Sequence, residues 1–164
     1  MKGKAMDAIV AVYSDWGIGA DGTQPVILKA DRQHFVELTR GRTVIVGRRT
    51  LADFPGGRPL KGRRNIVLTR GDTVIDGAEI AHSAAEAAEI SGADAMVLGG
   101  QSVFRDMMPY TDRVFVTKIN CRPHSDSFFE DLDASADWRI TDRSDTLCEG
   151  DIEYSFICYE RIKK

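Results

Sequence analysis

Short β-branched runs alternate with helical segments along most of this 164-residue chain. A run of this kind, bounded by turn residues, is typical of a buried strand. Such runs predict strands over residues 7–13, 43–46, 64–69, 78–81, 95–98 and 113–119. Apolar residues at helical spacing predict helices over residues 30–39, 84–90 and 102–108, with Ser83 in position to cap the second. Strands that alternate with helices predict a mostly parallel sheet covered on both faces.

The last part of the chain departs from this alternation. Residues 138–141 and 153–161 predict two strands with no helix between them, joined by a loop around Cys148-Glu149-Gly150-Asp151. Adjacent strands of this kind predict an antiparallel hairpin at one side of the sheet. We therefore expect an α/β fold, a three-layer sandwich with a sheet of about eight strands, forming a single domain over residues 1–164.

Composition excludes several classes of protein. No apolar run approaches the length of a membrane span, and the opening MKGKAMD lacks the apolar stretch of a signal peptide. We therefore expect a cytoplasmic protein without membrane association. The 3 cysteines have no CxxC spacing, so neither a disulfide framework nor a metal site is expected. The net charge of -3 argues against a general nucleic-acid binder.

A single carboxylate stands out near the start of the first predicted helix. Asp31 precedes Phe35 and Leu38, which share one helical face. An acid beside an apolar face is suited to hold a flat cationic or amide-bearing heterocycle. A purely structural role remains open, because acids near a helix N-terminus interact favourably with the helix dipole.

Glycines and basic residues follow the predicted strands. Strand 95–98 runs into Gly99-Gly100-Gln101-Ser102-Val103-Phe104, where glycines let a ligand approach the backbone, although the GxGxxG fingerprint is absent. A tight strand-to-helix turn is the alternative. Strand 43–46 runs into Gly47-Arg48-Arg49-Thr50, and strand 64–69 into Thr69-Arg70. Ligands of such sheets bind outside the carboxyl ends of the strands, where arginines grip phosphate bidentately. Each arginine alone is equally consistent with a solvated surface charge.

The other reactive side chains form no recognisable motif. His34, His82 and His124 are scattered and make no metal or triad pattern, so each is expected to be solvated or packed. Ser102 lacks the GxSxG context of a hydrolase nucleophile.

Several motifs in order resemble dihydrofolate reductase over nearly the whole chain. AIVAV at 8–12 and WGIG at 16–19 resemble its first strand and active-site loop. VIVGRRT at 44–50 resembles its cofactor turn, and MVLGGQSVF at 96–104 its second glycine turn with the aromatic that follows. GRPLKGRRN at 57–65 resembles the segment that carries an arginine for the glutamate tail of folate, here Arg63. Thr117 in VTKI resembles the threonine behind the catalytic acid, and Asp126 and Phe129 resemble its GDTxFP loop.

This resemblance implies NADPH-dependent reduction of 7,8-dihydrofolate to 5,6,7,8-tetrahydrofolate, with a hydride passing to C6 and a proton to N5. It implies that Asp31 is the catalytic acid, with its pKa raised by desolvation between Ile9 and Phe35. We expect a monomer whose partners are dihydrofolate and antifolate inhibitors. The substrate contacts implied are Ile9, Val10, Arg32, Phe35, Leu60, Arg63, Leu98 and Thr117. The cofactor contacts implied are Ala11, Ile18, Gly19, Gly47, Arg48, Arg49, Thr50, Leu68, Thr69, Arg70, His82, Gly99, Gly100, Gln101, Ser102, Val103 and Phe104.

Three positions depart from the family's usual pattern. Val26 follows Pro25 where many members have a tryptophan, whose indole N–H helps to hold a water near the acid. Arg32 replaces a usual Leu or Met, and Lys29 a Pro. We therefore expect a wider, wetter pocket mouth and weaker binding of diaminopyrimidine inhibitors. We also expect the charge of Arg32 to favour the ionised form of Asp31.

Two alternatives stay open. The pyrimidine reductase of riboflavin synthesis has a similar fold, but it would not call for Asp31 together with Arg63. A catalytically silent nucleotide-binding module would bind NADPH without oxidising it in the presence of dihydrofolate.

Overall fold

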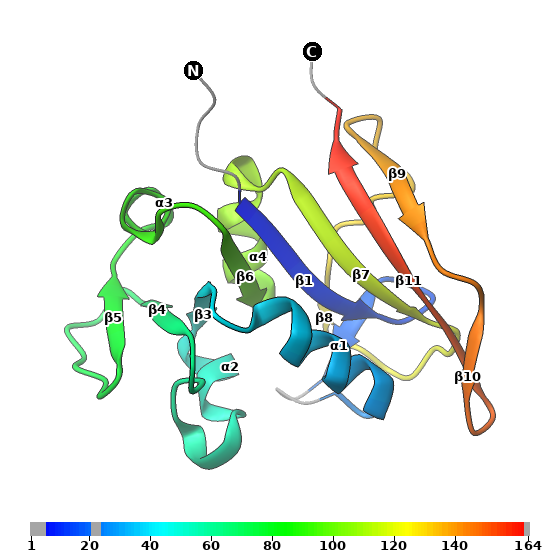
Figure 1. The fold of residues 1–164 in the computed structure, drawn as a ribbon, viewed down its shortest axis with the longest axis horizontal. Coiled ribbons are helices and arrows are strands. Elements are labelled where there is room, and N and C mark those ends of the chain that lie inside the picture. The colour runs from blue at the N-terminus through cyan, green and yellow to red at the C-terminus, as the bar shows by residue number, and fades with distance from the viewer. Residues whose placement is uncertain (1–5, 21–23, 163–164) are drawn as a thin grey trace.

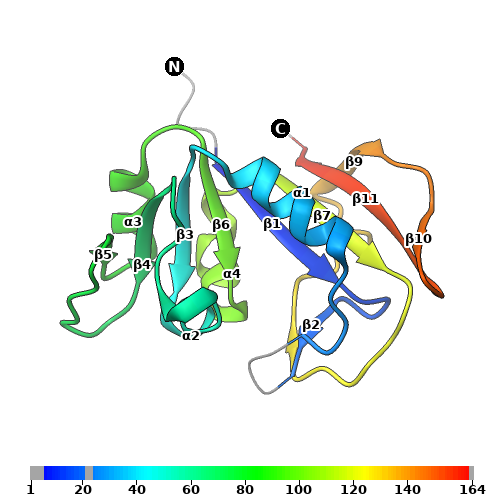
Figure 2. The same cartoon turned by 60° about the horizontal axis from the view of Figure 1, so that its bottom comes forward.

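A single twisted sheet forms the centre of the molecule, and helices pack against both of its faces (Figures 1 and 2). The computed structural model describes residues 6–20 and 24–162. The sheet has nine strands in the order β10-β11-β7-β1-β6-β3-β4-β5, and β9 also pairs with β11. The strands are β1 (Met6–Val12), β3 (Thr43–Gly47), β4 (Arg64–Leu68), β5 (Ala78–Ala81), β6 (Ala95–Gly99), β7 (Arg113–Ile119), β9 (Trp138–Arg143), β10 (Leu147–Glu149) and β11 (Ile152–Arg161).

The pairing is parallel from β7 through β1, β6, β3 and β4 to β5. At the other side of the sheet, β11 pairs antiparallel with β7, β9 and β10. The helices are α1 (Lys29–Thr39), α2 (Arg48–Ala52), α3 (Ala84–Ser91) and α4 (Gln101–Met107), with short 3₁₀ turns η1 (Pro55–Gly57) and η2 (Met108–Tyr110). A second, two-stranded sheet joins β2 (Gly17–Gly19) to β8 (Ser127–Phe128). The predicted three-layer α/β sandwich is confirmed.

The predicted strands and helices agree with the observed ones to within about two residues, the usual uncertainty of element ends. Ser83 caps α3 as expected, because its hydroxyl accepts a hydrogen bond of 3.0 Å from the backbone N–H of Glu86. Two expectations were wrong. The loop expected around Cys148 forms β10, which pairs with β11 and makes the sheet nine strands. The basic turn after β3 is the first turn of α2.

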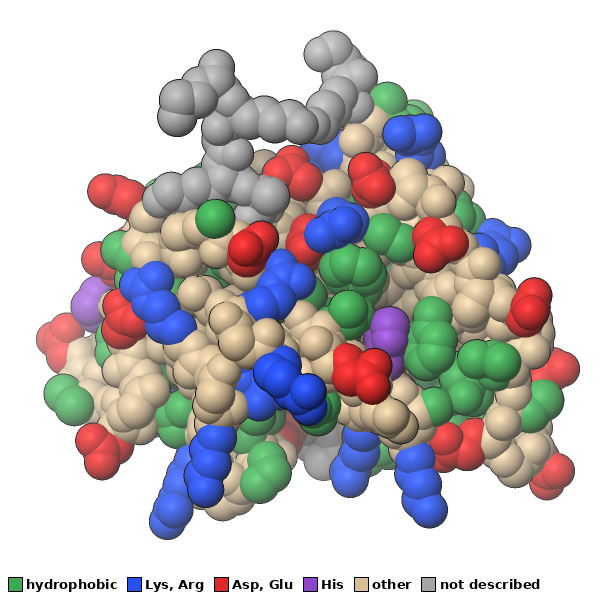
Figure 3. All heavy atoms as spheres, viewed as in Figure 1, with side chains coloured by type: hydrophobic (Ala, Val, Ile, Leu, Met, Phe, Trp, Pro, Cys, Tyr) green, Lys and Arg blue, Asp and Glu red, His purple; other side chains and the backbone are tan. Residues whose placement is uncertain are grey.

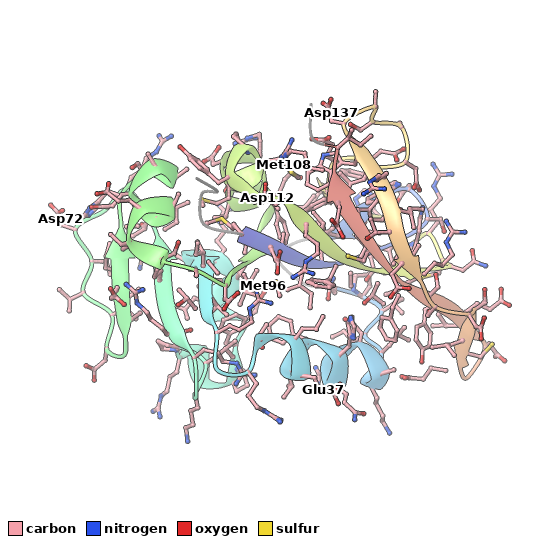
Figure 4. The ribbon with its side chains drawn as sticks, turned by 45° about the horizontal axis from the view of Figure 1, so that its top comes forward. Glu37, Asp72, Met96, Met108, Asp112 and Asp137 are labelled. Carbon is pink, nitrogen blue, oxygen red and sulfur yellow. The ribbon has the colours of Figure 1, made fainter. Side chains whose placement is uncertain are left out.

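Alternation along the strands separates two apolar layers. Successive strand residues point to opposite faces of a sheet. Val10 of β1 therefore packs on the side of α3 and α4, in a cluster with Phe104. Its neighbour Ile9 packs on the side of α1 and α2, in a cluster with Phe35 and Leu51. Met96 of β6 is fully buried in this second cluster, and Figure 4 shows it in the middle of the molecule.

A buried carboxylate at the start of β1 forms ion pairs with two arginines. Asp7 at the start of β1 is 3% exposed and accepts hydrogen bonds from Arg42 and Arg113. The guanidinium of Arg42 lies 2.9 Å away and that of Arg113 3.0 Å. These pairs satisfy the carboxylate, which would otherwise be costly to bury. No described helix is long and apolar enough to cross a membrane.

Candidate active site

The first turn of α1 brings Asp31 against the middle of β7. The hydroxyl of Thr117, a buried residue of β7, donates a hydrogen bond of 2.6 Å to Oδ1 of Asp31. Burial raises the pKa of Asp31, and the hydrogen bond from Thr117 opposes that rise. The family resemblance implied both the partner and the direction of the shift. The result is an oriented carboxyl group that is poorly solvated and holds a proton more readily than an ordinary aspartate.

The neighbouring basic group that acts on this acid is His34, in its protonated form, and not Arg32. Arg32 is exposed, whereas His34 is half-buried and stacks on Phe156 with ring centroids 4.1 Å apart. The charge of His34 lowers the pKa of Asp31. Burial in turn lowers the pKa of His34. The expected effect of Arg32 on the acid was therefore wrong, because that side chain is on the solvent side of α1.

The apolar residues predicted to line the substrate pocket fall in one cluster. Ile9, Leu98, Phe35 and Leu60 belong to it, and they come from β1, β6, α1 and the segment before β4. Val10 is the exception, because strand alternation turns its side chain to the opposite layer. Four elements distant in sequence therefore build a wall beside Asp31, whereas the side chain of Val10 lies away from it.

Arg63 is held beside the same helix by three acceptors. Its Nε and Nη2 donate to the hydroxyl of Thr39 at 3.2 and 3.1 Å. Nη2 also donates to the carbonyl of Val36 at 3.2 Å, and Nη1 to that of Lys61 at 2.6 Å. Burial and the neighbouring charge of Arg40 both lower the pKa of Arg63, although the group remains cationic. The guanidinium is thus fixed in orientation, and the nearby charge of Arg40 adds to its own positive charge. Both properties suit a site that binds an anion.

Val26, where the tryptophan is missing, is held by Tyr13. The Tyr13 hydroxyl donates to the Val26 carbonyl at 3.2 Å and accepts from the Val26 N–H at 3.1 Å. The amide of Gln24 donates to the carbonyl of Ala11 at 3.4 Å. The backbone here is therefore fixed by the hydroxyl of Tyr13, the residue after β1, and by the Ala11 carbonyl of β1. No pattern in the sequence assigned this role to Tyr13.

The ends of β3 and β6 come very close to one another. A Cβ atom added to Gly47 would lie 2.9 Å from Val103 Cγ2, and one added to Gly100 would lie 3.3 Å from Thr50 Oγ1. Only glycine fits these contacts without displacement. Gly99 and Gly100 are joined by a cis peptide bond. The two glycine turns that the sequence singled out therefore lie together at the carboxyl ends of the strands, with Gly47 buried and Gly100 half-buried. The close approach to the backbone that glycine allows there suits a pyrophosphate-containing ligand.

Basic side chains lie near these glycine turns, at the ends of β3 and β4. Arg48, Arg49 and Arg70 are all exposed, and Arg48 donates to the hydroxyl of Thr73 at 3.4 Å. In the space-filling view, Lys and Arg side chains project from the edge of the molecule near α1 and α2 (Figure 3). These guanidiniums are accessible to a phosphate group. The predicted set of cofactor contacts at the ends of β3 and β4 is thus brought together.

His82 follows β5 at the same side of the sheet. Its side chain is exposed and has acidic neighbours: Asp72 lies 3.8 Å and Glu86 3.6 Å from its ring nitrogens. Figure 4 shows Asp72 at the outer edge of the molecule. His82 is solvated, as its isolated position in the sequence predicted. These acids compete with an anionic ligand for His82, so its contribution to a cofactor site is smaller than that of the arginines.

Three further predicted cofactor residues, Ile18, Gly19 and Gln101, lie where β2 meets β8. Gln101 accepts a hydrogen bond of 2.6 Å from the Phe128 N–H. The Gly19 carbonyl accepts one of 3.0 Å from Asp126. Ile18 packs in the same cluster as Phe104. The loop that carries Ile18 and Gly19 is therefore connected to the Gly-Gly turn through β8. Asp126 and Phe129, which resemble the family's GDTxFP loop, take part in this connection through their backbone N–H groups, which donate to Gly19 and Trp16.

Known proteins share this chain's sequence and fold. The family model for dihydrofolate reductase matches residues 5–161. The type 3 dihydrofolate reductase of Salmonella typhimurium is 38% identical over 130 residues, which cover 77% of this chain and 78% of that protein. Dihydrofolate reductase of Bacillus subtilis (strain 168) is 32% identical over 158 residues, covering 93% and 92%.

A solved structure gives the same answer. Dihydrofolate reductase from Enterococcus faecalis, complexed with NADP(H) and RAB-propyl, superposes with a TM-score of 0.87 at 28% identity and covers 97% of each chain. Neither the pyrimidine reductase nor the silent nucleotide-binding module finds support in these comparisons. A family match over almost the whole sequence, joined to an oriented acid at the expected position, establishes that this chain belongs to the dihydrofolate reductase family.

Proposed function

We propose that Asp31 is the catalytic acid of a dihydrofolate reductase that converts 7,8-dihydrofolate to 5,6,7,8-tetrahydrofolate with NADPH. The family match supports the reaction. The observation that carries the assignment of Asp31 is its hydrogen bond to Thr117 in a poorly solvated position beside an apolar wall. A carboxyl group placed in this way recognises a flat heterocycle that offers two N–H groups side by side.

Asp31 orients the pterin ring through its two oxygens. They accept hydrogen bonds from the 2-amino group and from N3–H, while Thr117 fixes the rotation of the carboxyl group. Its raised pKa keeps part of the population protonated closer to neutral pH than an ordinary aspartate would be. Pairing with this acid favours the substrate protonated at N5, and water carries the proton to that atom. Ile9 and Phe35 exclude other water from the ring faces.

Arg63 binds the other end of the substrate. Its guanidinium is held by Thr39 and the Lys61 carbonyl, and it remains in reach of a carboxylate at the surface. Its Nη1 donates one hydrogen bond to the Lys61 carbonyl, which leaves the second Nη1–H to donate a charge-assisted hydrogen bond to a carboxylate. The α-carboxylate of the glutamate tail therefore fixes the long axis of the substrate, while Asp31 fixes the pterin.

NADPH, when bound, supplies the hydride that C6 of the pterin receives. The residues suited to hold it are the glycine turns at Gly47 and Gly100, with Thr50 beside Gly100. Arg48 and Arg70 are suited to grip the 2′-phosphate, since both are exposed at neighbouring strand ends. Catalysis then depends on positioning the two rings face to face, which needs no covalent nucleophile.

The protein is proposed to act as a cytoplasmic monomer. Antifolates are proposed to occupy the substrate site, and diaminopyrimidines to bind more weakly than in members with the tryptophan. Val26, which takes that position, fills much less volume than an indole.

The test of the proposed function is loss of absorbance at the reduced nicotinamide band when the purified chain is mixed with dihydrofolate and NADPH. Turnover that needs both reactants and is abolished by a tight antifolate supports the proposal. NADPH binding without turnover would contradict it.

A further inference from the structure

The helix that carries Asp31 begins without a cap of its own. Leu28 occupies the N-cap position of α1, and its side chain provides no hydrogen bond to the first turn. The first backbone N–H groups of a helix have no partner inside the helix. Polar residues usually supply one from the N-cap position itself.

The carboxylate of Glu149, distant in sequence, accepts the hydrogen bonds that an N-cap side chain would otherwise accept. Glu149, the last residue of β10, accepts a hydrogen bond of 2.8 Å from the Lys29 N–H at Oε2. Its Oε1 accepts another of 3.1 Å from the Ala30 N–H. Both oxygens of one side chain therefore bind the two residues that immediately precede Asp31. Figures 1 and 2 both place β10 near this end of α1.

With this contact, a continuous series of hydrogen bonds and strand pairings runs from Asp31 through β7, β11 and β10 and back to the start of α1. Asp31 is bonded to Thr117 on β7. Thr117 lies opposite Phe156 on β11, and Ile152 of β11 lies opposite Glu149 on β10. Glu149 then returns to the start of α1. The helix is thus fixed to the same antiparallel part of the sheet at two points, one just before the acid and one at the acid itself.

We infer that Glu149 is a positioning residue for the reaction, which clamps the first turn of α1 so that Asp31 meets Thr117 and the substrate in one orientation. The inference rests on the proposed role of Asp31. Glu149 touches no reacting atom in this scheme. It acts by holding the first turn of α1 in place. Its negative charge suits this role, because the helix dipole favours carboxylates near a helix N-terminus.

The test compares Glu149→Ala and Glu149→Gln with the control Asp151→Asn, which removes the same charge two residues along the same turn. We expect Glu149→Ala to lower kcat/KM for dihydrofolate by about tenfold, the scale of a lost positioning contact. Glu149→Gln keeps one carbonyl acceptor and should lose less. Asp151→Asn should be unchanged, as should NADPH affinity in all three. Unchanged kcat/KM in Glu149→Ala would overturn the inference.

A double-mutant cycle separates positioning from simple stabilisation. If Glu149 acts through the contact between Asp31 and Thr117, its loss should cost less in a Thr117→Val background, because coupled residues are not additive. An equal loss in both backgrounds would overturn the inference. Dihydrofolate binding, followed by the fluorescence of Trp16 and Trp138, provides the second readout, and Glu149→Gln carries the test if Glu149→Ala does not fold.

The two proposals fail differently. Wild-type protein without turnover would count against the role of Asp31, and the Glu149 variants would then be judged by dihydrofolate binding alone. Normal wild-type turnover with a Glu149→Ala variant of equal activity would count only against the clamp.

Discussion

The hydroxyl of Thr39 links Arg63 to the helix that carries Asp31. It accepts hydrogen bonds of 3.2 and 3.1 Å from the guanidinium, and it donates one of 2.7 Å to the Phe35 carbonyl one turn earlier. Thr39 is fully buried, so water does not replace it. The two ends of the proposed substrate site, Asp31 and Arg63, are therefore held by opposite ends of α1.

Replacing Thr39 by Val should misorient Arg63 without removing its charge. We expect KM for dihydrofolate to rise several-fold in Thr39→Val and about tenfold in Arg63→Ala, equivalent to ~1.4 kcal/mol for a partly exposed charge pair. Steady-state kinetics with dihydrofolate measures both. A pterin substrate without the glutamate tail serves as the control, and an equal loss with that substrate would make Arg63 a structural residue.

Arg48 and Arg70 should determine the preference for NADPH over NADH. Replacing both by Ala removes the exposed guanidiniums proposed to bind the 2′-phosphate, so KM for NADPH should rise while NADH kinetics stay nearly constant. Because exposed charge pairs are screened, added salt should weaken NADPH binding more than NADH binding. Equal use of both cofactors by the unmodified protein would show that these arginines are ordinary surface charges.

Asp31 should make the protein less stable at neutral pH than an uncharged residue would. Its pKa is higher in the folded than in the unfolded chain, so the folded state binds its proton more tightly. That stabilisation is complete below the unfolded pKa and is lost as the pH rises through the folded pKa. Asp31→Asn should therefore raise Tm near neutral pH and have little effect at acid pH, where wild type is also neutral. A Tm difference independent of pH would contradict the raised pKa.

Replacing Asp7, in contrast, should lower the stability of the protein and leave its activity nearly unchanged. Its carboxylate is buried between Arg42 and Arg113 at the end of the sheet away from the strand ends that form the site. Asp7→Ala should lower the free energy of unfolding by about 3 kcal/mol, the lower end for a broken buried pair, since Arg113 reaches solvent. Urea denaturation measures this. A large change in KM for either substrate would show that the two ends of the sheet are coupled.

Much of this arrangement is predictable because it depends on local patterns. Strand 43–47 and its glycine turn can be read from β-branched residues and Gly47, and Asp31 with Phe35 from helical spacing. The pairing of Asp31 with Thr117 was available only through the family resemblance, since 86 positions separate them.

Other features depend on tertiary contacts that no local pattern encodes. Glu149 lies in what the sequence presents as a loop, and its bonds to Lys29 and Ala30 span 120 and 119 positions. The orientation of Arg32 toward solvent and of His34 toward Phe156 depends on the rotation of α1 against β11. Glu37 shows the same rotation, because it lies on the exposed side of α1, where it accepts a hydrogen bond from Gln33 (Figure 4).

The most direct test of the central claim is kcat/KM for dihydrofolate in Asp31→Asn as a function of pH. Asparagine presents an amide N–H where the pterin needs a second acceptor, and it cannot ionise. We expect a loss on the order of 10²-fold near neutral pH, with NADPH binding retained and without the ionisation that wild type shows at the raised pKa of Asp31. Turnover of Asp31→Asn close to that of wild type at neutral pH would contradict the assignment of Asp31 as the catalytic acid.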